Sequence, residues 1–211
     1  QHIKREKATS NICTAQALLA TMAGFYAVYH GPEGIRTIAE RIHSIAVFLE
    51  KSINRLGYKQ VNAQYFDTLR FALPDTISAQ QIRTIALSKE VNLRYFKNGD
   101  VGMSIDETTD ITAVNVLLSI FAIAAGRDWE KASDVPMASS ISAEMKRQST
   151  YLTHEVFNKY HTETEMMRYI KRLDRKDISL AHSMISLGSC TMKLNAAAEM
   201  LPLSRPEFMN I

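Results

Sequence analysis

Residues 93–126, LRYFKNGDVGMSIDETTDITAVNVLLSIFAIAAG, contain the pattern that decides the fold. Asn98-Gly99 lies between two short runs with apolar residues, an arrangement typical of a β-hairpin with a tight turn. Residues 108–110 (Thr-Thr-Asp) then supply N-cap candidates for an apolar segment that ends at Gly126, as a buried helix does. The stretch therefore predicts two antiparallel strands followed by a helix.

The segment before this hairpin adds one strand and one helix to the prediction. Residues 66–73 alternate apolar side chains as far as Pro74, which favours a half-buried strand. Ser78 is a suitable N-cap for a short helix after it. The resulting order of β, α, β, β, α predicts an α+β domain in which helices cover a small, mostly antiparallel sheet.

Two long helices are expected ahead of the sheet. Ser10 and Asn11 are N-cap candidates for the first, which Gly31 and Pro32 end, and the second runs from about residue 35 to Gly57. The apolar positions of the first helix, at helical spacing, are Ile12, Ala15, Leu18, Leu19, Met22, Phe25 and Tyr26. Both helices are expected to add packing surface to the domain.

The chain changes character beyond Trp129. Residues 133–150 are rich in serine and lack a periodic apolar pattern, so we expect a linker there. Thr162 and Glu165 form the sequence signature of a capping box at the start of a helix. The residues that this helix is expected to bury are Met166, Ile170 and Leu173. A weaker helical run covers about residues 194–200.

Composition excludes several classes of function. The net charge is only +3. Charged residues make up 22% of the chain, and basic and acidic ones are interspersed, so nucleic-acid binding is not indicated. The apolar stretch 113–125 is too short for a membrane span and includes Asn115 and Ser119. Cys13 and Cys190 fit neither a disulfide framework nor a zinc motif, which favours a reducing compartment.

The residues alone predict no complete catalytic site. The glycines are dispersed, and neither glycine-rich phosphate-binding motif occurs. His161 and Glu165 fall one helical turn apart, but two ligands without a third make a weak metal site, so we expect no metal. The sequence therefore indicates a soluble α+β domain with a polar tail.

Four stretches carry a resemblance to a known family. They are residues 5–16 (REKATSNICTAQ), 160–169 (YHTETEMMRY), 189–195 (SCTMKLN) and 196–202 (AAAEMLP). In this order they resemble the signatures of glycine decarboxylase, the P-protein of the glycine cleavage system. The first and third are long enough to be specific, and the resemblance covers most of the chain.

The resemblance implies a division of the chain. The family's long polypeptide resembles two tandem halves, each similar to a fold-type I pyridoxal-phosphate (PLP) enzyme with a large domain and a small C-terminal domain. Residues 1–132 would be the small C-terminal-type domain of the first half, 133–150 a linker, and 151–211 a helical and extended lead-in to the second half. On this interpretation the chain is an internal fragment that spans the junction.

The resemblance also implies an activity for the parent protein. That protein would decarboxylate glycine with PLP and transfer the aminomethyl group to the lipoyl carrier H-protein. A homodimer in the bacterial cytoplasm is expected, or in the mitochondrial matrix of a eukaryote. The cofactor lysine is expected beyond Ile211, in a His-Lys-Thr context that this sequence lacks. The fragment alone is therefore expected to be inactive.

The residues that the resemblance places at the edge of the active site are Ser189, Cys190, Thr191, Lys193, His161 and Glu163. Ser189 and Thr191 equally suit capping of the next helix, and His161 and Glu163 equally suit a surface capping box. Lys193 is not expected to be the cofactor lysine. A non-catalytic scaffold that docks a partner, and the small domain of another fold-type I PLP enzyme, are the alternative functions.

Overall fold

A computed structural model describes residues 16–176 and 197–209. Its contacts divide the chain into two units, residues 1–159 and residues 160–211, which are described separately. Within the described ranges, no helix combines the length and apolar character needed to cross a membrane. The structure does not describe residues 1–15, which include the expected caps Ser10 and Asn11.

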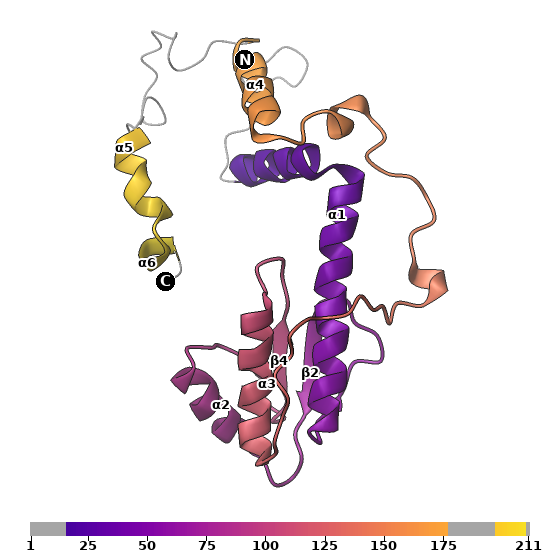
Figure 1. The fold of residues 1–211 in the computed structure, drawn as a ribbon, viewed down its shortest axis with the longest axis vertical. Coiled ribbons are helices and arrows are strands. Elements are labelled where there is room, and N and C mark those ends of the chain that lie inside the picture. The colour runs from indigo at the N-terminus through magenta and orange to yellow at the C-terminus, as the bar shows by residue number, and fades with distance from the viewer. Residues whose placement is uncertain (1–15, 177–196, 210–211) are drawn as a thin grey trace. The chain divides into compact units, whose positions relative to one another are not determined.

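A long helix with one break leads the first unit (Figure 1). This helix, α1, spans Gln16–Arg55 and is interrupted at Gly31, whose φ of 63° and ψ of −176° are not helical. Glycine adopts such a conformation without strain, and Pro32 has no N–H to continue the hydrogen-bond ladder. The predicted end of one helix and start of another at this point are confirmed. Gly57, with φ of 101°, follows the second half of α1.

Four antiparallel strands form one sheet in the order β1-β2-β4-β3. Their bounds are Lys59–Gln60 for β1, Thr68–Ala72 for β2, Arg94–Tyr95 for β3 and Val101–Ser104 for β4. The predicted hairpin is confirmed, because β3 and β4 pair around Asn98-Gly99 and Gly99 has a φ of 90°. The two-residue strand β1 was not predicted.

Two further helices complete the α+β fold. Ser78 caps α2 (Ala79–Ser88), and Asp110 caps α3 (Ile111–Ala125) by accepting a 2.7 Å hydrogen bond from the N–H of Ala113. Gly126 ends α3 in the left-handed conformation, at φ 60°. The predicted order β, α, β, β, α is therefore confirmed, with β1 as an addition at one edge of the sheet.

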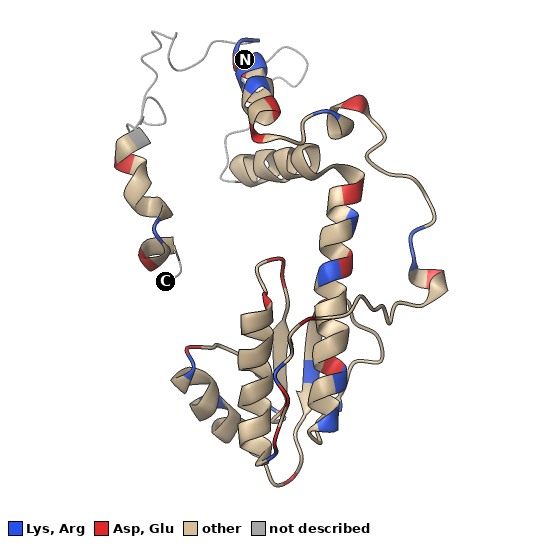
Figure 2. Cartoon of the chain, viewed as in Figure 1, with Lys and Arg blue, Asp and Glu red and all other residues tan. Residues whose placement is uncertain are grey.

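A single core joins the three helices to one face of the sheet. Alternate residues of β2 and β4 point to the same face, and the cross-strand pairs Leu69–Met103 and Phe71–Val101 are buried there. Against them pack Leu49 of α1 and side chains from α2 and α3. Figure 2 shows α3 without a charged residue, as expected for a helix that is largely buried.

Residues 132–151, here called the strap, run from α3 back along α1 and are fastened by hydrogen bonds. The side-chain amide of Asn115 pairs with both backbone groups of Ala132, at 2.8 and 2.9 Å. Ser44 Oγ accepts a 3.0 Å bond from the N–H of Ala138. The Tyr151 hydroxyl donates to the carbonyl oxygen of Pro32 over 2.7 Å. The strap includes the predicted linker, residues 133–150, and has little regular structure beyond the short 3₁₀ helix η1 (Ala143–Met145).

The second unit contains mainly short helices in its described part. They are α4 (Glu163–Asp174), α5 (Ala197–Met200), η3 (Leu201–Ser204) and α6 (Pro206–Met209). The predicted capping box of Thr162 and Glu165 is present at the start of α4. A 3₁₀ helix, η2 (Glu155–Asn158), closes the first unit.

Two expected apolar faces are not buried by the described residues. No residue of α4 is buried, and Ile170 remains 44% exposed, so the prediction that this helix buries one face is wrong. Leu18, Leu19 and Met22 of α1 are also exposed, at 66, 65 and 58%. For α1 the cause is that the core forms around the sheet and includes no residue from the first half of this helix.

Candidate functional site

Most of the sequence-predicted site residues are not described by the structure. Ser189, Cys190, Thr191 and Lys193 lie within residues 177–196, outside the described ranges. Their place at the edge of an active site therefore stays a prediction.

His161 and Glu163 lie at the exposed start of α4. Between them, Thr162 Oγ1 accepts a 3.3 Å hydrogen bond from the N–H of Glu165, whose carboxylate accepts a 3.3 Å bond from the N–H of Thr162. The capping role of this stretch is thus present, and an active-site role for His161 or Glu163 stays a prediction. In the described part of the chain, no three His, Cys, Asp or Glu side chains are grouped to hold a metal ion.

An aromatic cluster flanks this helix start. The rings of Tyr160 and Tyr169 stack at 4.4 Å with 13° between their planes, and Arg172 lies 5.3 Å from each ring. Arg172 also donates a hydrogen bond to the Tyr160 hydroxyl. The cluster was not predicted from the sequence, although Tyr169 and Arg172 are three residues apart and share one helix face.

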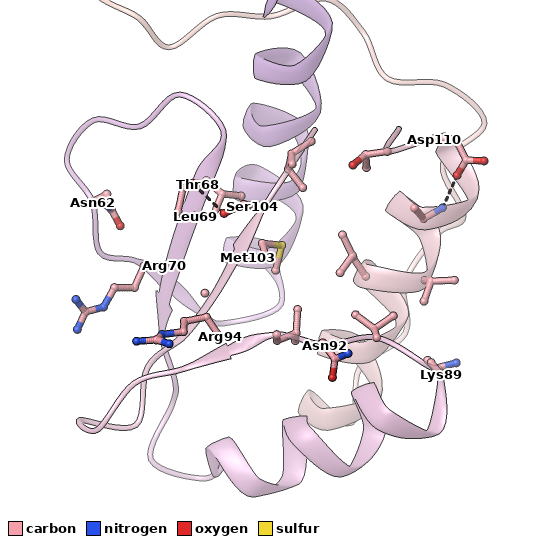
Figure 3. A pocket seen from close by; sticks show the side chains of 18 of the residues that line it. Asn62, Thr68, Leu69, Arg70, Lys89, Asn92, Arg94, Met103, Ser104 and Asp110 are labelled. Atoms are coloured by element: carbon pink, nitrogen blue, oxygen red, sulfur yellow. Dashed lines mark hydrogen bonds between the residues drawn. The ribbon is translucent and has the colours of Figure 1, made fainter. Parts of the chain in front are cut away.

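A groove of about 880 Å³ straddles β4 and opens between the sheet and α3 (Figure 3). Its inner wall is apolar and includes Leu69 and Met103 from the sheet, with Val116 from α3. Asn92 and Lys89, from the loop after α2, lie across the gap from the sheet in this view. The groove therefore combines an apolar interior with polar and charged margins, as binding sites do.

The outer margin of the groove carries two arginines on one phenylalanine ring. Arg70 of β2 and Arg94 of β3 are the partners of Gly102 on opposite sides of β4. The Phe96 ring covers Gly102, and the two guanidinium carbons lie 4.3 and 5.7 Å from its centroid. A Cβ at Gly102 would come within 2.9 Å of Phe96 Cε2, so only glycine fits beneath the ring. Figure 3 shows Arg70 and Arg94 extending to the same side of the sheet.

Charge is distributed unevenly along the groove. Arg70 forms a 2.7 Å ion pair with Asp100, and within the described residues Arg94 forms no ion pair. The Asp110 carboxylate, at the other end, caps α3. Nearby, hydrogen bonds from the hydroxyl of Thr108, then from its N–H and from Thr109, hold the pKa of Asp106 below its usual value. The β3 end is therefore positive and the α3 end negative.

Sequence analysis did not single out this groove. Arg70 and Arg94 are 24 positions apart in the numbering, and only the strand register brings them to one glycine. The available signal was Gly102, because a glycine inside a strand often marks a close approach of another group.

The fold of the first unit belongs to the α+β class, because helices cover one face of an open antiparallel sheet. The sequence model of the family described as "Glycine cleavage system P-protein" matches residues 1–121. The chain belongs to the glycine cleavage system P-protein family.

Curated relatives agree with this family. A protein named glycine dehydrogenase (decarboxylating) from Bacteroides fragilis is 83% identical over 209 residues, which cover 99% of this chain and 22% of the relative. Relatives of the same name from Bacteroides thetaiotaomicron and Flavobacterium johnsoniae are 81 and 53% identical, and each alignment covers 100% of this chain and 22% of the relative. The chain spans about a fifth of the length of these relatives.

Proposed function

We propose that this chain is a portion of a glycine dehydrogenase (decarboxylating). The parent protein decarboxylates glycine with PLP and passes the aminomethyl group to the lipoyl carrier H-protein. The observation that carries this proposal is the 83% identity over 99% of the chain with a relative of that name. Because the alignment covers 22% of that relative, the activity belongs to the longer protein.

Within that parent, residues 1–132 form the small domain of the first fold-type I half, 133–150 a linker, and 151–211 the lead-in to the second half. The sheet with helices on one face supports the first assignment. The exposed apolar side chains of Leu18, Leu19 and Met22 also support the proposal, since such a patch commonly packs against another part of a protein.

The described residues do not suit PLP attachment. A lysine that carries this cofactor is activated by a desolvated site or a neighbouring cation, whereas the buried polar side chains of the described residues are His43, Ser44, Asp100 and Ser119, with no lysine among them. The resemblance to the family, with its His-Lys-Thr context, is what supports a cofactor lysine beyond Ile211. When bound in the parent, PLP supplies the electron sink for decarboxylation.

The chain's contribution to that site comes from its C-terminal motif, residues 189–193. Ser189, Cys190, Thr191 and Lys193 line the edge of the parent's active site, with His161 and Glu163 as further candidates. Hydroxyl groups there bind a carboxylate or phosphate by donating hydrogen bonds to its oxygens, and the ammonium of Lys193 adds positive charge.

Two measurements on purified proteins test the proposal. The product of the complete gene, given PLP and a lipoyl carrier, should release labelled carbon dioxide from carboxyl-labelled glycine, whereas residues 1–211 alone should not. Residues 1–211 mixed with PLP and reduced with borohydride should carry no stable label on Lys193 above the level of the Lys193→Arg variant. Glycine decarboxylation by the short chain, or specific labelling of Lys193, would overturn the proposal.

The parent's assembly and surroundings follow from the same family. The proposed partners are the lipoyl H-protein and a second copy in a homodimer, and the proposed compartment is the bacterial cytoplasm. The relatives described above come from bacteria such as Bacteroides fragilis, which supports a bacterial source. A docking role for the short chain by itself is the alternative, and the groove beside β4 is the observation that favours it.

A further inference from the structure

The edge of β4 remains open beyond Gly102. Strand β3 pairs with β4 only through Arg94–Gly102 and Tyr95–Val101. The N–H of Ile105 donates to the carbonyl oxygen of Asp67, on the β2 side of β4. Because backbone groups alternate between the two edges of an antiparallel strand, the N–H and C=O of Ser104 point to the opposite edge. No backbone partner from the described residues pairs with them there.

The groove gives this open edge room for another segment. Its volume of about 880 Å³ extends along Met103, Ser104 and Ile105 on one side and the first turns of α3 on the other. A segment hydrogen-bonded to Ser104 would lie between these walls as an additional strand, a recognised mode of peptide binding.

Strand geometry fixes where the side chains of such a segment point. Side chains alternate between the two faces of a sheet, so a residue opposite Ser104 shares the outer face with Arg70 and Arg94. The neighbour opposite Ile105 shares the inner face with Met103 and Ile105, where the groove wall is apolar, whereas the position opposite Met103 adjoins Arg94 of β3. The site therefore fits an acidic residue next to an apolar one.

Charge at this point favours an acidic residue opposite Ser104. Arg70, Arg94 and Lys89 line the groove, and the lining carboxylate, Asp110, already accepts the capping hydrogen bond of α3. Arg70 is partly neutralised by Asp100, whereas Arg94 has no ion pair among the described residues. A carboxylate beside Arg94 would neutralise the second of the two guanidinium groups that lie over the Phe96 ring.

We propose that this groove binds an extended acidic segment of the parent polypeptide, from outside residues 1–211, as an added strand beside Ser104. This inference rests on the proposed function, since a longer parent supplies the segment. Relatives in which this region accounts for 22% of the length have ample chain for it. A segment of the same polypeptide is also held at high effective concentration, which favours an interaction that makes few hydrogen bonds.

Photo-crosslinking in the complete gene product tests the proposal. A benzophenone amino acid replaces Asn92 at the groove, and in a control it replaces Gln80, an exposed residue of α2 that does not line the groove. After irradiation, the Asn92 product should keep the mobility of a single chain. Mass spectrometry should find position 92 joined to a peptide from outside residues 1–211 with an acidic residue next to an apolar one.

Charge variants make the test specific to the arginine. Arg94→Glu should lower the yield of this crosslink by about fivefold, and Arg94→Lys should retain most of it, because an exposed ion pair contributes a modest factor of this size. A crosslink to a second copy or to a separate protein, or a yield no higher than that from Gln80, would overturn the inference.

The same preparations separate this inference from the proposed function. Glycine decarboxylation is measured before irradiation. An active protein without the Asn92 crosslink refutes the groove occupant and leaves the proposed function standing. If the unsubstituted protein is inactive but the protein with benzophenone at position 92 gives the expected crosslink, the proposed function is refuted and the occupant is supported.

Discussion

The imidazole of His43 on α1 accepts, at Nε2, a 3.0 Å hydrogen bond from the backbone N–H of Ser140, 97 residues further along the chain. Its Nδ1 lies 2.8 Å from the carbonyl oxygen of Phe66, and because a carbonyl can only accept, Nδ1 carries the proton. His43 is only 2% exposed. One buried ring thus joins α1, the loop before β2 and the strap.

Replacing His43 with alanine should release the strap. The change leaves the N–H of Ser140 and the carbonyl of Phe66 without their buried partner, which costs about 3 kcal/mol of unfolding free energy. Urea denaturation measures this cost, and limited proteolysis should show earlier cleavage within residues 132–151. Gln80→Ala, on the exposed side of α2, serves as the control and should change neither measurement. Equal protease resistance in the two variants would contradict the fastening role.

Tyr58 makes the stability of the first unit vary with pH in the alkaline range. Burial raises the pKa of its hydroxyl to about 12, and that hydroxyl donates a 2.8 Å hydrogen bond to the carbonyl of Phe121. The unfolded chain loses this proton near the ordinary pKa of 10.0, so the folded form binds more protons above that pH and its stability falls as pH rises from 10 to 12. Tyr58→Phe should cost about 1 kcal/mol at pH 8.

The advantage of the unsubstituted chain over Tyr58→Phe should shrink as pH rises above 10, because the phenylalanine has no proton to lose. Urea titrations of both proteins at a series of pH values measure this difference. A difference that stays constant up to pH 11 would show that the Tyr58 proton is not held by folding.

Gly102→Ala should destabilise the sheet through Phe96. The new Cβ would lie 2.9 Å from Phe96 Cε2 and 3.2 Å from the carbonyl oxygen of Leu69, an overpacked contact that costs about 2 kcal/mol. Gly24→Ala is the matched control, since a Cβ there meets nothing within 4 Å, and it should cause no loss. Thermal unfolding compares the two. In a Phe96→Ala background the cost of Gly102→Ala should fall, and strictly additive effects would refute this explanation.

Leu19→Gln should leave the unfolding free energy of the isolated chain within about 0.5 kcal/mol, because Leu19 is 65% exposed. Leu49→Ala, at a side chain with 0% exposure, should by contrast cost about 3 kcal/mol. Urea denaturation distinguishes these outcomes. In the complete gene product, Leu19→Gln should become destabilising, and a neutral effect there would mean that the rest of the parent does not cover this face.

Local signals predicted those parts of the fold that local chemistry determines. Asn98-Gly99 specified the hairpin, Gly31-Pro32 the break in α1, and Thr162 with Glu165 the start of α4, because each depends on residues within a few positions. Strand β1 was missed because two residues carry no periodic pattern and pair only through their partner strand.

The groove and the strap depend on contacts between distant positions, which a single sequence does not reveal. Nothing near His43 indicates Ser140, and nothing near Arg70 indicates Arg94. The predicted active-site edge came from resemblance instead. Its central motif, which includes Ser189 and Lys193, lies outside the described residues and so remains a prediction.

The attachment of the strap to His43 and Ser44 sets an order of events during synthesis. Helix α1 and all four strands leave the ribosome before residues 138–140, and the hairpin of β3 and β4 closes over a short loop. Contacts near in sequence form faster than distant ones. The sheet and its helices can therefore assemble first, and the strap, which emerges later, docks onto their surface. A ribosome stalled before residue 138 would display this domain without the hydrogen bonds that attach the strap to His43 and Ser44.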